Sequence, residues 1–318
     1  MENMPTVKEI VDKMYSPSKD DIALVHKAYS FAEEAHKDQK RFSGEPYFNH
    51  LVATAMNLAE LGMGATTIAA GLLHDTIEDT GVREETLQSE FGPEILFLVQ
   101  GVTKLGKLKY RGAERHIESL QKLFVAMAED IRVLIIRLTD RLHNMQTLEY
   151  VPAHKQKRIA EETLEIYAPL AYRLGMRRLN RELEDLAFAY TDPENHKKTS
   201  ELLKEKTDKI DLNLSKTLNE LKRALAKDGV TNFKTDYRVK GLYSLFKKLE
   251  RKEMDIETVY DISAIRIIVT SVADCYRVLG IIHHEWRPML GRIKDYIAVP
   301  KPNGYRSIHT TVFTGDGD

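Results

Sequence analysis

The 318-residue sequence contains one cysteine, Cys275, and this scarcity excludes two classes of protein. A single thiol cannot form an intrachain disulfide framework, and it cannot supply a thiolate zinc site. A small disulfide-stabilised secreted domain is therefore excluded, and a reducing compartment is indicated. We interpret Cys275 as a small, buried hydrophobic residue.

The sequence also has no long hydrophobic run and no excess of charge of one sign. The first residues, MENMPTVKEIVDKMY, have no apolar core of the kind a signal peptide needs, and no later run has the length of a membrane span. Lys and Arg number 47 and Asp and Glu 48, for a formal net charge of -1. No global field therefore attracts nucleic acid or an acidic membrane. We expect a cytoplasmic protein without a membrane or nucleic-acid partner, in which any polyanion site is local.

The apolar pattern changes along the chain and predicts two domains joined by a helix. Residues 1–193 carry apolar side chains at helical spacing, so we expect an all-helical domain. Residues 194–229 are rich in Lys and Glu and predict a helical connector. Residues 230–318 contain the β-branched run AIRIIVTS and the alternating run YRSIHTTVF, which predict strands and an α+β domain. The chain stops at TGDGD, where a further hairpin strand is expected, so we expect this domain to be incomplete.

Metal-capable side chains are concentrated in the segment TTIAAGLLHDTIEDT. This segment predicts one helix in which His74 and Glu78, and likewise Asp75 and Asp79, are one turn apart. Polar groups therefore gather at one end of an otherwise apolar helix.

Two further segments bring polar side chains to the same domain. IRVLIIRLTDRLHNMQTL predicts a helix with one packing face and one polar face. RFSGEPYFNH predicts a Gly-Glu-Pro turn that leads into a helix. Their polar side chains are Asp140, Asn144 and Thr147 on the helix, and Arg41, Ser43 and His50 around the turn.

Two imidazoles and two carboxylates in this set suit a divalent Mn, Fe or Zn ion. These four are His50, His74, Asp75 and Asp140. Such an ion polarises a phosphoryl oxygen and lowers the pKa of its bound water, and Glu78 and Asp79 would then orient that water or move its protons. A single His or carboxylate is more often a satisfied core or surface residue. The order His, then His-Asp, then a later Asp on separate helical segments favours the metal site.

These motifs resemble the hydrolase domain of the RelA/SpoT homologue family. The resemblance is carried by RFSGEPYFNH, GLLHDTIEDT, GVTKL, AMAEDIRVLIIRLTDRLHNMQTL, YAPLAYRLGM and ELEDLAF, which cover nearly the whole first domain. It implies an HD-type fold that hydrolyses (p)ppGpp to GDP or GTP plus pyrophosphate. It implies that the two imidazoles and two carboxylates hold manganese, and that Glu78 and Asp79 are the catalytic acidic pair. Family members without hydrolysis lack the HD motif, and HDTIEDT is intact here.

The resemblance also implies a guanine-nucleotide pocket, with departures from the family pattern. The pocket positions are Arg41, Ser43, Asn144 and Thr147. Phe42 stands where the family commonly has a basic residue, Arg137 where it has Lys, and Tyr172 where it has His. Arg137 keeps its charge, whereas Phe42 removes one cation from a phosphate or base contact.

A second, basic constellation lies in the C-terminal domain. Arg238 and Lys240 share one side if the chain is extended, and Lys240, Ser244 and Lys248 share one face of the helix that follows. Taken alone, the lysines are explained equally well by a solvent-exposed helix face and by a phosphate-binding site. Asp261 precedes the β-branched run, where a carboxylate could hold Mg on a triphosphate.

The end of the chain adds an aromatic group to this constellation. Tyr305 and His309 are expected on one side of the final strand, and Lys301 lies near Tyr305 in sequence. A tyrosine could stack on a base while the lysine meets phosphate, although a strand tyrosine is more often a packing residue.

These segments resemble the synthetase domain of the same family, which transfers pyrophosphate from ATP to the 3′-oxygen of GDP or GTP. The strings are YRVKGLYSLFKKL, VYDISAIRIIV and GRIKDYIAVPKPNGYRSIHTTVF, and RIKD resembles the basic form found in bifunctional members. The implied positions are Arg238, Lys240, Ser244 and Lys248 for ATP phosphates, Asp261 for magnesium, and Lys301, Asn303, Tyr305 and His309 for the acceptor. No EVQIRT-like segment with the second catalytic acid follows, so we expect poor or no synthesis by this chain.

Three other functions remain open from the residues alone: an HD phosphohydrolase of other nucleotides, a nucleotide-sensing module, and an RNA-binding basic helix. The expected partners are the small molecules (p)ppGpp, GDP, GTP and pyrophosphate. Ribosomal or regulatory partners would require C-terminal domains that this sequence does not contain.

Overall fold

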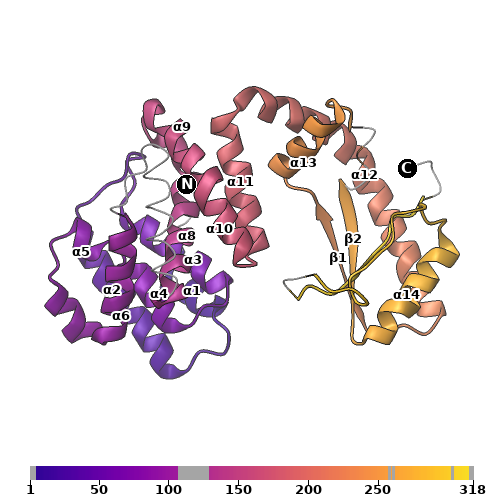
Figure 1. The fold of residues 1–318 in the computed structure, drawn as a ribbon. Helices are drawn as coiled ribbons and strands as arrows, with labels where there is room; N and C mark the ends of the chain where they lie inside the picture. Colours follow the sequence, from indigo (N-terminus) through magenta and orange to yellow (C-terminus); the bar gives the residue numbers. More distant parts are fainter. Residues whose placement is uncertain (1–4, 107–128, 257–258, 260–261, 302–303, 315–318) are drawn as a thin grey trace. The chain divides into compact units, whose positions relative to one another are not determined.

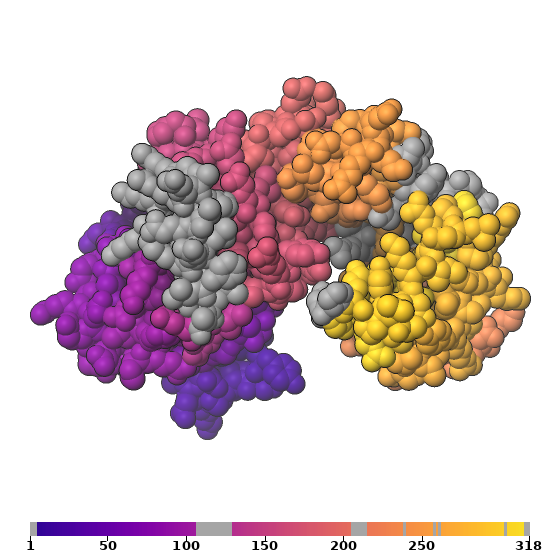
Figure 2. Space-filling view, in the orientation of Figure 1, coloured from indigo at the N-terminus to yellow at the C-terminus, as the bar shows by residue number. Residues whose placement is uncertain are grey.

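The computed structural model describes residues 5–106, 129–256, 259, 262–301 and 304–314, without the side chains of 205–214 and 238–239. It divides into two compact units, Met1–Pro193 and Glu194–Asp318, which are drawn in Figure 1 and, as filled atoms, in Figure 2. Among the described residues, no helix is both long and apolar enough to span a membrane.

Unit 1 is helical, which confirms the fold predicted for the first domain. Two of its helices begin with capping boxes, in which Thr6 pairs with Glu9 and Ser18 with Asp21. The helices are α1 (Val7–Lys13), α2 (Lys19–Ala35), α3 (Phe48–Glu60), α4 (Ala65–Leu73), α5 (Thr76–Asp79), α6 (Glu84–Gly106), α8 (Ile131–Gln146), α9 (Ala153–Glu162), α10 (Ala168–Arg173) and α11 (Arg177–Thr191), with the short turns η1 (Leu148–Tyr150) and the π-helical η2 (Thr163–Tyr167).

Helix α4 is at the centre of unit 1 and is apolar except for Thr66 and Thr67. It packs against α2, α3, α6 and α8, so that every residue from Ala65 to Leu73 except Thr66 is buried. A helix surrounded by other helices has no solvent face to keep polar, which explains the sequence ATTIAAGLL. Its C-terminal end therefore delivers the next residue, His74, into the protein interior.

The prediction of one continuous helix through TTIAAGLLHDTIEDT is wrong. Helix α4 ends at Leu73, and the short α5 begins at Thr76. Two side chains end the first helix: His74 Nδ1 lies 2.8 Å from the Gly71 carbonyl oxygen, and Thr76 Oγ1 donates to the Leu73 carbonyl at 2.6 Å. In a longer helix these carbonyls would accept hydrogen bonds from backbone amides; here the two side chains supply the donors.

Unit 2 combines helices with two small antiparallel sheets, which confirms the predicted α+β class. Strand β1 pairs with β2 from Phe233↔Val269 to Val239↔Ser263, and β3 pairs with β4. Apolar side chains of the β1–β2 sheet pack against α12 and α14. The elements are α12 (Pro193–Lys227), β1 (Phe233–Val239), α13 (Leu242–Leu249), η3 (Glu250–Lys252), β2 (Ser263–Val269), α14 (Val272–Glu285), β3 (Lys294–Asp295) and β4 (Ile308–His309).

Three expectations for unit 2 need correction. The run YRSIHTTVF forms a strand only at Ile308–His309. The residues that follow make isolated backbone hydrogen bonds, such as the one from the Met289 amide to the Thr311 carbonyl, and not a continuous ladder. Lys240 precedes α13, whose N-cap is Gly241, so Lys240 is not on the helix face that carries Ser244 and Lys248. Cys275 is half-buried and not fully buried.

Helices α6 and α8 approach closely at Gly101, where a larger side chain would disturb their packing. A Cβ at Gly101 would lie 2.7 Å from Val133 Cγ2 and 3.0 Å from its Cγ1, and a β-branched side chain has little rotamer freedom with which to move away. We expect Gly101→Ala to lower the free energy of unfolding by about 1–3 kcal/mol, measured by denaturant titration with circular dichroism. Gly280→Ala in α14, where a Cβ meets nothing within 4 Å, is the control and should not destabilise; equal stability of the two variants would contradict the packing.

Candidate functional site

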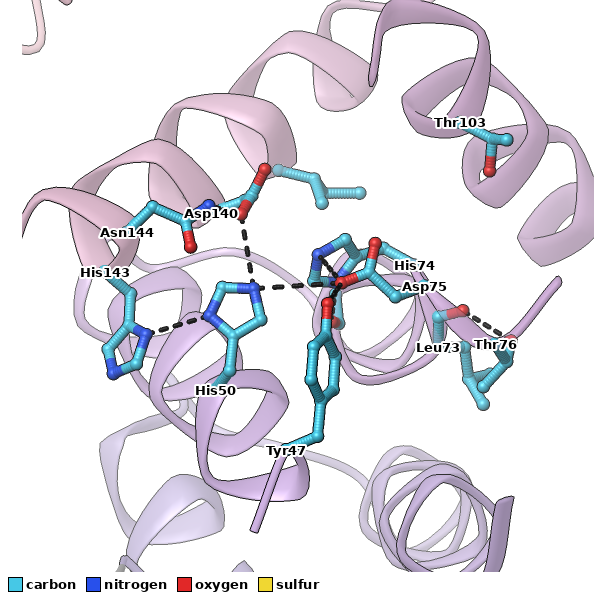
Figure 3. Close-up of polar contacts among 12 residues, drawn as sticks. Tyr47, His50, Leu73, His74, Asp75, Thr76, Thr103, Asp140, His143 and Asn144 are labelled. Carbon is cyan, nitrogen blue, oxygen red and sulfur yellow. Dashed lines mark hydrogen bonds and ion pairs between the residues drawn. The ribbon is translucent and has the colours of Figure 1, made fainter. Parts of the chain in front are cut away.

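Three side chains from three segments of unit 1 meet in its interior. His50 comes from α3, His74 from the end of α4 and Asp140 from α8, and one ligand atom from each lies within 4.8 Å of the others. All three are buried. Asp75 joins them, with Oδ2 at 3.1 Å from His74 Nε2 and 3.8 Å from His50 Nε2. Figure 3 shows these four side chains converging, and we call them the His-Asp cluster.

The hydrogen bond of His74 determines which of its ring nitrogens carries the proton. A carbonyl oxygen can only accept, so His74 Nδ1 must donate to the Gly71 carbonyl. The lone pair of the neutral ring is therefore on Nε2, which faces Asp75 and has no hydrogen-bond partner among the described residues. A buried nitrogen of this kind is suited to hold a cation.

His50 is oriented in the same way by a neighbouring histidine. The guanidinium of Arg41 can only donate, so His143 Nδ1, 2.8 Å from Arg41 Nη1, accepts. His50 Nδ1, also 2.8 Å from His143 Nδ1, must then donate. The lone pair of His50 is consequently on Nε2, which faces Asp140 Oδ1 at 3.2 Å, and His50 lies between His143 and Asp140 in Figure 3.

Two imidazole lone pairs and two carboxylates thus point into one buried region, where only a positive charge relieves their repulsion. A proton on His74 is one solution: burial alone would lower its pKa, but the charges of Asp75 and Asp140 raise it to about 9. A divalent cation is the other, and the two-nitrogen, two-carboxylate donor set fits such an ion.

Asp140 is held by two further side chains of its own helix. Arg137, one turn earlier, donates to Oδ2, and Asn144 Nδ2, one turn later, donates to Oδ1 at 2.5 Å. Burial would raise the pKa of Asp140, but the charge of Arg137 holds it well below its ordinary value. Asp140 is therefore an ionised carboxylate with a defined orientation.

The sequence motifs did not single out Tyr47 and His143 as members of this group. The Tyr47 hydroxyl donates to Asp75 Oδ2 at 2.7 Å. Burial, followed by the charges of His50 and Arg41, lowers the pKa of His143 to about 3. The signal was present, because Tyr47 and His143 are each three residues from a cluster member, His50 and Asp140 respectively, and this spacing places side chains together on a helix.

The predicted pocket residues of unit 1 divide into two groups. Arg41 and Asn144 reach the His-Asp cluster, since Arg41 Nη2 donates to Asn144 Oδ1 at 2.6 Å. Ser43 and Thr147 make local bonds: Ser43 Oγ accepts from the Glu45 amide at 3.4 Å, and Thr147 Oγ1 donates to the His143 carbonyl at 2.9 Å. Of the departures from the family pattern, Phe42 is 70% exposed, and Tyr172 stacks under the Arg177 guanidinium.

The predicted acidic pair is at the surface of α5. Glu78 and Asp79 both have exposed side chains, and the backbone carbonyl of Asp79 accepts a bond of 2.5 Å from Gln39 Nε2. Their helix directly follows Asp75, so the pair adjoins the His-Asp cluster in the chain.

In unit 2 the structure brings part of the second constellation together. Lys301 Nζ lies 4.5 Å from the ring centroid of Tyr296 and 5.3 Å from that of Tyr305, and the Tyr305 hydroxyl is 3.0 Å from His309 Nε2. Ser244 and Lys248 are one turn apart on α13. Asp261, Asn303 and the side chain of Arg238 lie outside the described residues.

Comparison with known proteins gives two family matches. Residues 28–177 match the model described as an HD domain, and residues 237–318 match the region found in RelA / SpoT proteins. The first match contains the whole His-Asp cluster, and the second contains α13 and the aromatic group around Lys301.

Three curated relatives are similar over most of this chain. A guanosine-3′,5′-bis(diphosphate) 3′-pyrophosphohydrolase of Aquifex aeolicus is 45% identical over 98% of the chain and 44% of its own length. A probable enzyme of the same name from Synechocystis is 45% identical over 91% of the chain and 38% of its length. A GTP pyrophosphokinase of Streptomyces coelicolor is 46% identical over 92% and 34%.

The chain therefore spans less than half the length of these relatives. Both family regions occur in it, in the order HD domain and then RelA/SpoT region. The chain belongs to the RelA/SpoT family of proteins that join these two regions.

Proposed function

We propose that unit 1 hydrolyses the 3′-pyrophosphate of (p)ppGpp to give GDP or GTP and pyrophosphate, with manganese as the ion. The observation that carries this proposal is the convergence of two imidazole lone pairs and two carboxylates in the His-Asp cluster, of which only Asp75 is partly exposed. The names of the Aquifex and Synechocystis relatives support the substrate.

In this proposal His50, His74, Asp75 and Asp140 hold the ion. A divalent cation at such a site polarises a phosphoryl oxygen and lowers the pKa of a water molecule. Arg137 keeps Asp140 ionised, and the bonds from His74 to the Gly71 carbonyl and from His50 to His143 keep both Nε2 lone pairs directed inward.

Glu78 and Asp79 are proposed as the proton-transfer groups. Hydrolysis joins a water oxygen to the phosphorus bonded to O3′ of the ribose, and O3′ leaves with a proton. The exposed carboxylates of α5 are accessible to solvent and to a bound nucleotide, so they can take the water proton and return it.

Arg41, Ser43, Asn144 and Thr147 are proposed to contact the nucleotide. Binding through Arg41 and Asn144 requires these residues to exchange the hydrogen bond that joins them. Phe42 offers the nucleotide an exposed ring where the family commonly offers a cation, so phosphate affinity is expected to be lower at this position. The alternative of a general HD phosphohydrolase predicts equal turnover of a 5′-nucleotide that lacks the 3′-pyrophosphate.

For unit 2 we propose a nucleotide site of the synthetase type. Lys240, Ser244 and Lys248 would face ATP phosphates, with Mg²⁺, and Lys301, Tyr305 and His309 would face a guanine nucleotide. The contact of Lys301 with two tyrosine rings supports the second part, because it places a cation beside surfaces on which a base can stack. Arg238, Asp261 and Asn303 stay predictions, as do absent synthesis and cytoplasmic location. A module that only senses nucleotide would use the same residues.

The first prediction concerns hydrolysis. We expect metal-stripped protein to release no pyrophosphate from ppGpp, and added Mn²⁺ to restore release in the wild type but not in Asp75→Ala. Glu78→Gln and Asp79→Asn should each lower kcat by about 10²–10⁴-fold with Mn²⁺ affinity unchanged. Release that depends on neither the ion nor Asp75 would refute the metal-dependent hydrolase.

A second prediction follows from the pKa of His74. Because a ligand nitrogen must be deprotonated, Mn²⁺ binding at about pH 7.5 should release about one proton. Calorimetry in buffers of different ionisation enthalpy measures this number, which should fall towards zero above the His74 pKa of about 9. No proton release near neutral pH would contradict the assignment of His74.

The same pKa predicts how stability depends on pH without the ion. The folded-state pKa of His74 is raised above its ordinary value of 6.5 to about 9. Its contribution to stability is therefore fully present below pH 6.5 and lost as the pH rises through about 9. Thermal denaturation of metal-stripped protein should show this loss, and saturating Mn²⁺ should weaken it.

A further inference from the structure

We propose that His36, Gln39 and Tyr47 form a clamp that holds both ends of α5 and so positions Glu78 and Asp79 beside the His-Asp cluster. All three are positioning residues, since they act through α5 and Asp75. The inference rests on the proposed hydrolase, for which the placement of the acidic pair matters.

The clamp contacts α5 at each end. Asp75 is the N-cap residue of α5, and its Oδ2 accepts a bond of 2.7 Å from the Tyr47 hydroxyl. Asp79 is the last residue of α5, and its backbone carbonyl accepts the bond of 2.5 Å from Gln39 Nε2. One bond therefore holds the start of the helix and another holds its end.

His36 joins the two arms of the clamp. Its ring is fully buried and stacks on Tyr47, with centroids 5.1 Å apart and planes at 9°. Its Nδ1 lies 2.7 Å from Gln39 Oε1, an atom that can only accept, so the ring donates. The Tyr47 amide also donates to the Gln39 carbonyl at 2.9 Å. His36 thus contacts both Gln39 and Tyr47, while each of these two side chains bonds its own end of α5.

Helix α5 depends on such external bonds because it is only four residues long. Its own turn is closed by the Asp79 amide to the Asp75 carbonyl at 2.9 Å and by the Thr80 amide to the Thr76 carbonyl at 3.3 Å. A single turn of helix is unstable by itself in water. Thr76 is buried and Ile77 packs against the core, whereas Glu78 and Asp79 are exposed and gain little from packing. The bond from Gln39 therefore constrains the end of α5 that carries the acidic pair.

The electrostatics of Tyr47 agree with this arrangement. Burial, then the charge and hydrogen bond of Asp75, then the charge of Asp79 raise the pKa of the phenol far above its ordinary value. The phenol therefore stays protonated and faces both carboxylates, one at each end of α5.

The test uses Gln39→Met, which keeps the side-chain length and adds no charge but removes the bonds to Asp79 and His36. The matched control is Gln156→Met, because Gln156 Nε2 donates to the Glu149 and Val151 carbonyls elsewhere in unit 1. With saturating Mn²⁺, we expect Gln39→Met to lower kcat for ppGpp at least about tenfold, with KM and Mn²⁺ affinity within about twofold of the control. Equal kcat in the two variants overturns the clamp, and so does a loss of kcat matched by lost Mn²⁺ binding.

Tyr47→Phe tests the other arm and should weaken Mn²⁺ binding by about 10-fold or more, because its bond is made to Asp75. Unchanged Mn²⁺ affinity would remove Tyr47 from the clamp.

A measurement without nucleotide separates the clamp from the proposed reaction. Amide hydrogen exchange at Asp79 and Thr80, followed by NMR on the whole chain, should be at least about tenfold faster in Gln39→Met than in Gln156→Met. Unchanged exchange refutes the clamp. If wild-type protein does not hydrolyse ppGpp while exchange still differs, the proposed function fails and the structural role of Gln39 stands.

Discussion

The structure of unit 1 depends on the burial of negative charge beside two imidazole lone pairs. Asp140 is buried, and Asp75 lies directly against the buried His74. Such an arrangement is unfavourable unless a cation or a proton occupies it. The surrounding residues serve that requirement: Arg137 balances one carboxylate, Tyr47 donates to the other, and main-chain and histidine acceptors direct the imidazoles.

Two of the four cluster residues, His74 and Asp75, lie at the break between helices α4 and α5. Helix α4, apolar except for Thr66 and Thr67, passes through the centre of unit 1. Side chains satisfy its last carbonyls, and the helix ends before Asp75. The following turn of helix, α5, buries Thr76 and packs Ile77 against the core, and it accepts bonds from Gln39 and Tyr47 at its two ends. In the proposed function, metal binding and proton transfer thus fall to adjacent segments of the chain.

The nucleotide site proposed for unit 2 has a different character. Its described part is built from a lysine, tyrosines and a histidine near the surface, without a buried charge group like that of unit 1 in the parts of the unit that the structure describes. Such a surface favours the flat, charged form of a nucleotide over a bare ion. The two proposed sites can therefore be tested separately, unit 1 with Mn²⁺ and ppGpp and unit 2 with ATP or a guanine nucleotide.

The sequence by itself determined the helical class of unit 1 and the α+β class of unit 2, because periodicity depends on local spacing. It also predicted the grouping of His50, His74 and Asp140, from the order of the motifs along the chain and their resemblance to a family. It mispredicted the break after Leu73, since side-chain bonds to the Gly71 and Leu73 carbonyls override helix propensity there. The roles of Tyr47, His143 and Gln39 came only from tertiary structure. Their partners are 28, 93 and 40 residues away in the chain. The spacing of Tyr47 from His50 and of His143 from Asp140 places them near the cluster, but it does not say which atoms they bond.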